Sequence, residues 1–396
     1  MTSPAPLGWI DESLAAIKRG NLFRARNIAR PLPGGQAQFA DEIRADFTSN
    51  DYLGLSRDPR IRAAARQALE EFANLGSGAS ALVSGRSPAS ARLEAALAQF
   101  EGTQDALLFP TGYAANLGVI TSLVDERDII FCDKLNHACL IDGCRLSRAA
   151  FRVYRSDRLE LLEDRLARAA DYPRRWIITE GIFGMDGLIA PLAELHAIAS
   201  RHDACLIVDE AHATGVIGPT GRGSCELAGL DDTRVIRTGT LSKAVGALGG
   251  FVPGSTNLIE YLWNNARTQM FSTALPPVVC AAATAAVRRI ATDSHSRDHL
   301  GELIQHLRNR LESELPPGGP QLLGDHRVPI VPLLIGDSGR AMEIAGQLAQ
   351  RGFAVAAIRP PTVPRGTARL RISLSASHDL ATVDALANAL IELSRP

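Results

Sequence analysis

The sequence predicts an α/β protein with a large domain built on a mostly parallel sheet, a smaller α+β carboxyl-terminal domain and an amino-terminal helical segment. Short β-branched runs alternate with helical stretches through the middle of the chain, which is the pattern of βαβ units. From about His295 the pattern changes to long helices with two or three strands. The 396 residues, 46% of them hydrophobic, can bury the cores of one large and one smaller domain.

The expected domains are an amino-terminal helix and extended segment at 1–55, the large domain at 56–290 and the small domain at 291–396. Helical periodicity predicts three early helices, at Ile10–Ile28, Pro59–Phe72 and Ser90–Phe100. Glycine, proline and serine mark the loops between them, at Pro31–Gly35, Phe47–Leu55 and Gly76–Gly85.

Apolar and β-branched runs then predict the strands. Those of the large domain are Ala106–Phe109, Ile129–Phe131, Phe151–Tyr154, Trp176–Thr179, Cys205–Asp209 and Val235–Thr238. Those of the small domain are Ile330–Leu334, Ala354–Ala357 and Ala368–Leu374. In a parallel sheet wrapped by helices, ligands bind beyond the carboxyl ends of the strands.

Composition excludes several classes of protein. The formal net charge is −1 and the arginines are scattered, so there is no electrostatic reason to expect nucleic acid or an anionic membrane as partner. The six cysteines contain no Cys-x-x-Cys pair and no zinc spacing, so no metal site is expected. The amino terminus lacks the layout of a signal peptide, and the longest uncharged run, Thr268–Val287, contains two prolines. We therefore expect a cytoplasmic protein with reduced thiols.

The segment Thr238-Gly-Thr-Leu-Ser-Lys-Ala-Val-Gly246 is the most informative part of the chain. It places Lys243 among hydroxyls and glycines directly after a strand. A lysine amine in such a setting can form a Schiff base with an aldehyde cofactor, while Thr240 and Ser242 offer hydroxyls to a phosphate.

A second motif, Leu206-Ile-Val-Asp-Glu-Ala-His212, brings Asp209 and His212 to the carboxyl end of a strand. Taken alone, such an aspartate is often a helix cap or a metal or ribose ligand, and such a histidine is often structural. A carboxylate that holds a pyridine nitrogen protonated, together with an imine-forming lysine, is the minimum that pyridoxal phosphate requires. The two motifs together therefore predict a pyridoxal 5'-phosphate site.

Four motifs carry a resemblance to a known family: Ser49-Asn-Asp-Tyr-Leu-Gly-Leu55, Thr179-Glu-Gly-Ile-Phe-Gly-Met-Asp-Gly187, Val208-Asp-Glu-Ala-His-Ala-Thr-Gly215 and Ala357-Ile-Arg-Pro-Pro-Thr-Val-Pro364. With them, nearly the whole chain resembles the α-oxoamine synthases, pyridoxal-phosphate enzymes with the aspartate-aminotransferase-like fold (fold type I). The first three motifs are shared across that family. The last motif favours the member that condenses L-alanine with pimeloyl-CoA or a pimeloyl-carrier protein.

The resemblance implies a role for each matching residue. Around the cofactor ring it implies Lys243 as the covalent attachment, Asp209 at the pyridinium nitrogen, His212 at the phenolic oxygen and His137 stacked on the ring. Around the phosphate it implies Gly112, Tyr113 and Thr240, with Ser272 and Thr273 reaching in from a neighbouring subunit. Near the substrate it implies Asn50, His137, Arg359, Thr362 and, from the amino-terminal helix, Arg24. The shared phosphate site implies a homodimer.

The implied activity is decarboxylative condensation that gives 8-amino-7-oxononanoate, coenzyme A and CO₂, a step of biotin biosynthesis. Two alternatives remain open: a sister synthase that uses glycine or serine with another acyl-CoA, and a catalytically silent partner subunit. The retention of Lys243, Asp209, His212 and His137 argues against the silent subunit.

Gly184 departs from the family's pattern, which usually has a serine whose hydroxyl helps to hold the cofactor's phenolic oxygen. If the backbone matches that of the family, Gly184→Ser is expected to strengthen cofactor binding by about 1 kcal/mol. If Gly184 instead has a positive φ, any side chain there costs stability.

Overall fold

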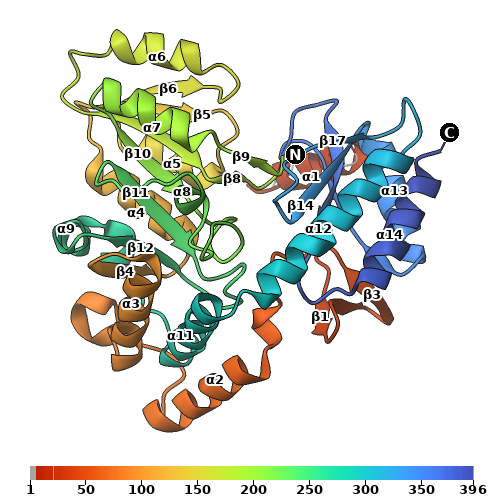
Figure 1. The fold of residues 1–396 in the computed structure, drawn as a ribbon, viewed down its shortest axis with the longest axis horizontal. Helices are drawn as coiled ribbons and strands as arrows, with labels where there is room; N and C mark the ends of the chain where they lie inside the picture. Colours follow the sequence, from red (N-terminus) through yellow and green to blue (C-terminus); the bar gives the residue numbers. More distant parts are fainter. Residues whose placement is uncertain (1–5, 21, 396) are drawn as a thin grey trace. The chain divides into compact units, whose positions relative to one another are not determined.

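The computed structural model describes residues 6–20 and 22–395 and divides into two compact units, which we call the central and the terminal unit (Figure 1). The central unit contains Asn50–Glu302 and Asp325–Pro329. The terminal unit contains Met1–Ser49, Leu303–Gly324 and Ile330–Pro396, so described residues from both terminal segments belong to the same unit. The expectation about a signal peptide concerns residues 1–8, of which 1–5 lie outside the described residues.

The central unit is built on a seven-stranded sheet with the order β4-β12-β11-β10-β7-β5-β6. Its strands are β4 (Asp105–Phe109), β5 (Ile129–Asp133), β6 (Ala150–Tyr154), β7 (Arg175–Glu180), β10 (Cys205–Asp209), β11 (Val235–Thr240) and β12 (Gly250–Gly254). All run in the same direction except β12, which is antiparallel to both of its neighbours. The carboxyl ends of the other strands therefore meet at one edge of the sheet.

Helices cover both faces of this sheet because alternate strand residues point to opposite sides. Ile178 and Ile207 pack into one buried cluster with residues of α4 and α5, whereas Ile177 and Leu206 pack into another with residues of α6 and α7. The helices of this unit are α2 (Pro59–Phe72), α3 (Pro88–Glu101), α4 (Gly112–Leu123), α5 (Ala138–Leu146), α6 (Leu159–Ala167), α7 (Leu192–Arg201), α8 (Ser224–Leu227), α9 (Thr256–Asn265), α10 (Arg267–Met270) and α11 (Pro277–Thr292).

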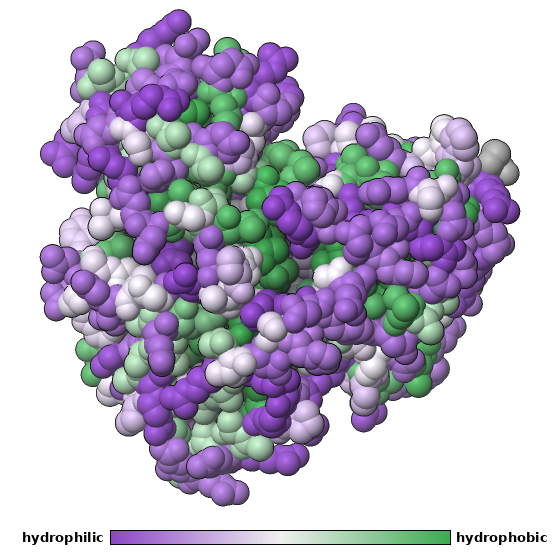
Figure 2. All heavy atoms as spheres, viewed as in Figure 1, coloured by the Kyte–Doolittle hydropathy of each residue, from purple (hydrophilic) through white to green (hydrophobic). Residues whose placement is uncertain are grey.

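Local sequence signals determine where these helices begin and how they face the core. Asp58 caps α2 and is followed by a proline at the first helical position, and Ser87 forms a capping box at the start of α3. In α6, Leu162 and Leu166 are buried, while the surface over this helix is largely hydrophilic (Figure 2). Short elements complete the unit: the helical turns at Leu55–Arg57 and Ala81–Gly85, and the hairpin of β8 (Ile182–Phe183) and β9 (Leu188–Ile189).

The terminal unit contains two four-stranded sheets. The first has the order β1-β2-β3-β15 and consists of β1 (Ala29–Leu32), β2 (Gln36–Phe39), β3 (Glu42–Asp46) and β15 (Phe353–Ala354). The second has the order β13-β14-β17-β16 and consists of β13 (Gln321–Leu322), β14 (Ile330–Gly336), β16 (Ala356–Ile358) and β17 (Ala368–Ser373). Its helices are α1 (Trp9–Arg19), α13 (Ser338–Gln350) and α14 (Leu380–Leu393), and α12 (His295–Glu314) joins it from Leu303 onward.

The structure confirms the α/β fold with a mostly parallel sheet and corrects several elements. The amino-terminal helix ends at Arg19 instead of Ile28, because Gly20 caps it and glycine is a poor helix former; residue 21 lies outside the described residues. The run expected as one strand at Ala354–Ala357 is divided between two sheets. β12 and the hairpin strands β1–β3 were missed. The glycines and proline of β12 and the proline of β1 resemble loop sequence, and β2 and β3 are short and rich in polar residues.

None of the helices within residues 6–20 and 22–395 is long and apolar enough to cross a membrane. Across the same residues, no group of three or more His, Cys, Asp and Glu side chains could hold a metal ion. All six cysteines are free thiols.

Glu101, at the end of α3, should make the stability of the protein depend on pH. Its buried carboxylate pairs with Arg237 at 2.7 Å, but burial still raises the pKa of Glu101 to about 7. The folded protein thus retains a proton that the unfolded chain loses near pH 4.5, so this group's contribution to stability falls as the pH rises from about 4.5 to 7. The difference in unfolding free energy between Glu101→Gln and the parent protein should change across this window, measured by urea denaturation. A difference that stays constant from pH 4.5 to 7 would contradict this.

Candidate active site

A pocket of about 260 Å³ lies at the carboxyl edge of the central sheet. Loops that follow β4, β5, β7, β10 and β11 supply its walls, as expected for a sheet of this kind. Its lining residues are Thr111, Gly112, Tyr113, Asn116, His137, Cys139, Glu180, Asp209, Ala211, His212, Thr240, Ser242 and Lys243. The pocket therefore brings together side chains from segments more than a hundred residues apart.

Lys243 reaches the pocket from a tight turn after β11. The carbonyl oxygen of Lys243 accepts the N–H of Gly246 at 2.9 Å, which closes the turn. Gly246 has a φ of +70°, and a Cβ there would lie 2.3 Å from the backbone nitrogen of Ser56, so glycine is required. Of the three lysines of the sequence, at positions 18, 134 and 243, Lys243 lines this pocket.

Asp209 is the last residue of β10 and is 5% exposed. Its carboxylate accepts hydrogen bonds from the side-chain amide of Asn116 at 2.7 Å and from the backbone N–H of Ala211 at 2.8 Å. Asn116 is held in turn by the hydroxyl of Thr238, which donates to its carbonyl oxygen at 2.6 Å. Two donors thus fix the carboxyl group of Asp209 at the wall of the pocket. Asn116 was missed in the sequence, although a buried polar residue in an apolar helix was a usable signal.

His212 follows Asp209 in the same loop and is buried. Its Nδ1 lies 2.7 Å from the hydroxyl oxygen of Tyr52, a hydrogen bond between residues 160 positions apart. The Nε2 edge of the ring faces Gly184, where an added Cβ would lie 2.3 Å from Nε2. The ring is therefore held on one edge and confined on the other.

His137 lies at the start of α5, and Glu180 holds its backbone. The carboxylate of Glu180 accepts the N–H of His137 at 2.6 Å. Burial and the nearby charge of Asp209 raise the pKa of Glu180 to about 8. Burial also lowers the pKa of His137, which favours the neutral imidazole. Glu180 lies inside a recognised motif, but sequence reasoning gave it no role.

The start of α4 forms the opposite wall of the pocket. Thr111 caps the helix by accepting the N–H of Ala114, which leaves the first N–H groups, those of Gly112 and Tyr113, for a ligand. A Cβ on Gly112 would lie 3.0 Å from the side chain of Thr240, so glycine keeps open the space between them. The hydroxyl of Tyr113 donates to Asp142 at 2.5 Å, and this bond raises the pKa of Tyr113.

These features fit pyridoxal phosphate. The pocket combines a primary amine, a fixed carboxylate, a neutral aromatic ring and a helix N-terminus, which match the aldehyde, ring nitrogen, ring face and phosphate of that cofactor. The space in front of Gly112 is the part that a side chain would fill.

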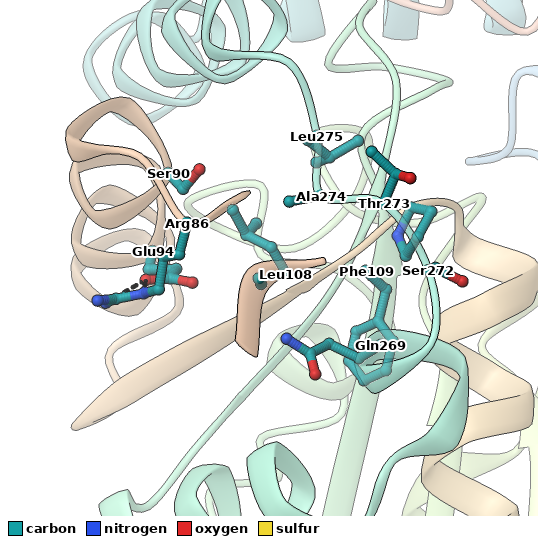
Figure 3. Close-up of a pocket in the computed structure, with 12 residues that line it drawn as sticks. Arg86, Ser90, Glu94, Leu108, Phe109, Gln269, Ser272, Thr273, Ala274 and Leu275 are labelled. Atoms are coloured by element: carbon teal, nitrogen blue, oxygen red, sulfur yellow. Dashed lines mark hydrogen bonds and ion pairs between the residues drawn. The ribbon is translucent and has the colours of Figure 1, made fainter. Parts of the chain in front are cut away.

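Ser272 and Thr273 line a different pocket of the central unit (Figure 3). The segment that carries them follows α10, and a β-bridge joins Thr273 to Ser80. Gln269 in the same pocket is 3% exposed, and neither atom of its amide has a hydrogen-bond partner among the described residues. Within a single chain, therefore, Ser272 and Thr273 do not line the pocket of Lys243.

Arg24, Arg359 and Thr362 belong to the terminal unit. Arg24 was expected in the amino-terminal helix, which is wrong: it lies after the end of α1 and is exposed. The guanidinium of Arg359 donates to the carbonyl oxygen of Phe23 at 3.0 Å, so the structure does bring the segment of Arg24 to Arg359. Thr362 donates its N–H to the carbonyl oxygen of Arg359 at 3.2 Å.

The geometry around Gly184 favours the opposite outcome for Gly184→Ser. The φ of Gly184 is not positive, but the new Cβ would lie 2.3 Å from Nε2 of His212 and would displace the ring. We expect the variant to lose about 1–3 kcal/mol of folding stability, as overpacked sites do, and to bind cofactor more weakly. Thermal melting and cofactor titration would measure both effects.

Gly184→Ala is the matched control, because it adds the Cβ without the hydroxyl. The steric account requires both variants to be impaired. Tighter cofactor binding by Gly184→Ser alone, at an unchanged melting temperature, would restore the hydrogen-bond account.

Comparison with known proteins gives consistent results. The family described as "Aminotransferase class I and II" matches residues 43–390. The 8-amino-7-oxononanoate synthase of Anaeromyxobacter dehalogenans is 46% identical over 97% of this chain and 95% of its own. Serine palmitoyltransferase from S. paucimobilis, solved with a PLP–myriocin aldimine, superposes with a TM-score of 0.91 at 30% identity over 98% of this chain and 97% of that chain. The structure of the 8-amino-7-oxononanoate synthase of Francisella tularensis superposes with a TM-score of 0.74 at 29% identity. The match covers 88% of this chain and 96% of that chain.

Proposed function

The chain belongs to the class I and II aminotransferases, and within them to the 8-amino-7-oxononanoate synthases, and we propose that it condenses L-alanine with a pimeloyl thioester. It is a pyridoxal-phosphate-dependent acyltransferase of biotin biosynthesis. The products are 8-amino-7-oxononanoate, CO₂ and, when the acyl donor is pimeloyl-CoA, free coenzyme A. The observation that carries the proposal is that Lys243, Asp209 and His212 line one pocket.

Pyridoxal phosphate, when bound, supplies an electron sink that stabilises negative charge on the α-carbon of the amino acid. Asp209 keeps that sink effective, because a fixed carboxylate favours a protonated ring nitrogen. Lys243 binds the cofactor, removes the α-proton of alanine with its Nζ and later returns a proton to the product. A carbon–carbon bond then forms to the acyl carbon, the thioester C–S bond breaks, and the carboxylate of alanine leaves as CO₂.

Two histidines orient the ring. His137 would stack on the ring face as a neutral imidazole, which its lowered pKa favours. His212 would contact the phenolic oxygen through its Nε2 edge, since Nδ1 is bonded to Tyr52.

The backbone N–H groups of Gly112 and Tyr113 would hold the phosphate of the cofactor, with Thr240 beside it, since all three residues line the pocket. Gly184, without a side chain, leaves room for the ring of His212 beside the cofactor.

The substrate is held by residues whose chemistry suits an amino acid and an acyl chain. Because a planar guanidinium pairs well with a carboxylate, we assign Arg359 to bind the carboxylate of alanine. Asn50 and Thr362 supply further hydrogen bonds, and Arg24 lies along the acyl chain. Within the terminal unit, the approach of the segment of Arg24 to Arg359 supports the assignment of these two residues to one site.

The enzyme acts as a cytoplasmic homodimer in which Ser272 and Thr273 complete the phosphate site of the partner subunit. Leu75, Val83 and Phe271 support this arrangement, because these large apolar side chains are 78%, 81% and 70% exposed. The segments that carry them lie side by side, joined by the bridge between Ser80 and Thr273. Such a group of apolar side chains marks a protein interface.

A mixing experiment tests the shared site. Lys243→Ala and the double variant Ser272→Ala, Thr273→Ala should each be nearly inactive when alone. After mixing and subunit exchange, activity should reappear, because a mixed dimer has one site with Lys243 from one subunit and both hydroxyls from the other. If no activity returns although co-purification of differently tagged subunits shows mixed dimers, or if sedimentation shows that the active species is a monomer, the shared site is wrong.

The substrate assignment is tested by a panel of amino acids against acyl thioesters, with release of free thiol as the readout. L-alanine with pimeloyl-CoA or pimeloyl-carrier protein should be the fastest pair. The likeness to serine palmitoyltransferase keeps one alternative, a sister synthase that prefers serine or glycine with another acyl chain. A higher kcat/KM with serine or glycine than with L-alanine would establish that alternative.

A further inference from the structure

Tyr52 links two residues to which the proposed function gives separate tasks. Its side chain is fully buried in the central unit. The hydroxyl oxygen lies 2.7 Å from Nδ1 of His212 and 3.1 Å from the side-chain oxygen of Asn50. His212 is assigned to the cofactor and Asn50 to the substrate. One hydroxyl group therefore connects the cofactor side of the site to the substrate side.

A hydroxyl carries a single proton, so these two contacts depend on each other. If the Tyr52 hydroxyl donates to the carbonyl oxygen of Asn50, it accepts from Nδ1–H of His212. If the amide of Asn50 donates to Tyr52 instead, the hydroxyl donates to Nδ1, and the neutral ring carries its proton on Nε2. The orientation of the Asn50 amide thus selects the tautomer of His212.

The other edge of His212 makes this choice matter. Nε2 lies on the side of Gly184, which leaves little space for the ring to move: a single added carbon would lie 2.3 Å from it. A ring held by Tyr52 and confined beside Gly184 has two protonation patterns and little freedom to rotate. A change at Asn50 is therefore transmitted to Nε2 as a change from hydrogen-bond donor to acceptor.

We propose that Tyr52 is a positioning residue that couples Asn50 to His212, so that a substrate group on Asn50 sets the tautomer of His212. The role of His212 toward a cofactor rests on the proposed function, whereas the hydrogen-bonded chain does not. The coupling is thus testable in cofactor-free protein.

The first measurement is the ¹⁵N spectrum of the histidine side chains in the cofactor-free protein, with His212 assigned from a His212→Asn variant. Tyr52→Phe keeps the ring and removes the hydroxyl, and it should shift the Nδ1 and Nε2 signals of His212. Asn50→Ala should also shift them, through Tyr52. Tyr154→Phe, at another buried tyrosine, on β6, is the matched control and should leave them in place. The proposal is wrong if the His212 signals stay unchanged in Tyr52→Phe. If Tyr52→Phe does not fold, unchanged His212 signals in Asn50→Ala would overturn it.

The second measurement is a double-mutant cycle of residues 50 and 52. It measures the affinity of the cofactor-loaded protein for L-alanine, with binding monitored by visible absorbance. The loss of affinity for L-alanine caused by Asn50→Ala should be about fivefold smaller when residue 52 is already phenylalanine. A factor of about five corresponds to the energy of one hydrogen bond. Strictly additive effects would also overturn the coupling. Failure of the substrate panel together with shifted His212 signals would instead refute the proposed function and leave the hydrogen-bonded chain established.

Discussion

Replacing Lys243 with alanine should lower turnover by more than about a thousandfold, the upper range for a positioned acid–base group. The amine is the side chain of this pocket that suits both covalent binding of the cofactor and transfer of the α-proton. The variant should still fold, since Lys243 is only half-buried. Turnover by thiol release and the visible absorbance of the purified protein measure both roles.

Borohydride reduction followed by peptide mapping gives an independent test of the same residue. The pyridoxyl group should be found on the peptide that contains Lys243. The sequence offers only two other lysines, Lys18 and Lys134, so the assignment is nearly unambiguous. Lys134→Ala, which removes an exposed lysine, is the control. Its label should be found on the Lys243 peptide, as in the parent protein. A label on Lys134 or Lys18, or normal turnover in Lys243→Ala, would refute the assignment.

Replacing Asp209 with alanine should lower turnover by about 10²- to 10³-fold, the cost typical of removing one preorganised electrostatic partner. Without the carboxylate, the ring nitrogen of the cofactor loses its proton more easily, and negative charge on the α-carbon is less stabilised. The absorbance of the bound cofactor, measured as a function of pH, should show that the ring nitrogen loses its proton more easily in the variant. Steady-state kinetics should assign the effect to kcat rather than to KM.

Asp133→Asn is the matched control for Asp209. Asp133 is also buried at the end of a parallel strand, but its carboxylate accepts from the N–H of Leu135 and its side chain does not line the pocket. A structural loss alone would impair both variants equally. Near-normal turnover in a folded Asp209→Ala protein would refute the role of the carboxylate as the electron-sink partner.

Local sequence determined much of this protein. β-Branched runs identified the parallel strands, and helical periodicity predicted the bounds of helices such as α2, which Asp58 caps in the structure. The pyridoxal-phosphate fold type I, the cofactor and the reaction class were readable from short motifs and are supported by the comparisons. These features could be read because a strand, a cap or an imine-forming lysine depends on residues close together in the sequence.

Tertiary structure decided what depends on distant segments. Asn116 and Glu180 gained their places in the site only when α4 and β7 packed beside the loops that carry Asp209 and His137. The reason for Gly184 is equally non-local, since the space it leaves is taken by the ring of His212. Packing also placed Tyr52 against a histidine 160 residues away. Hydrogen bonds and steric exclusion act over a few ångströms, so contacts between distant segments are set by the fold and leave no periodic signal in the chain.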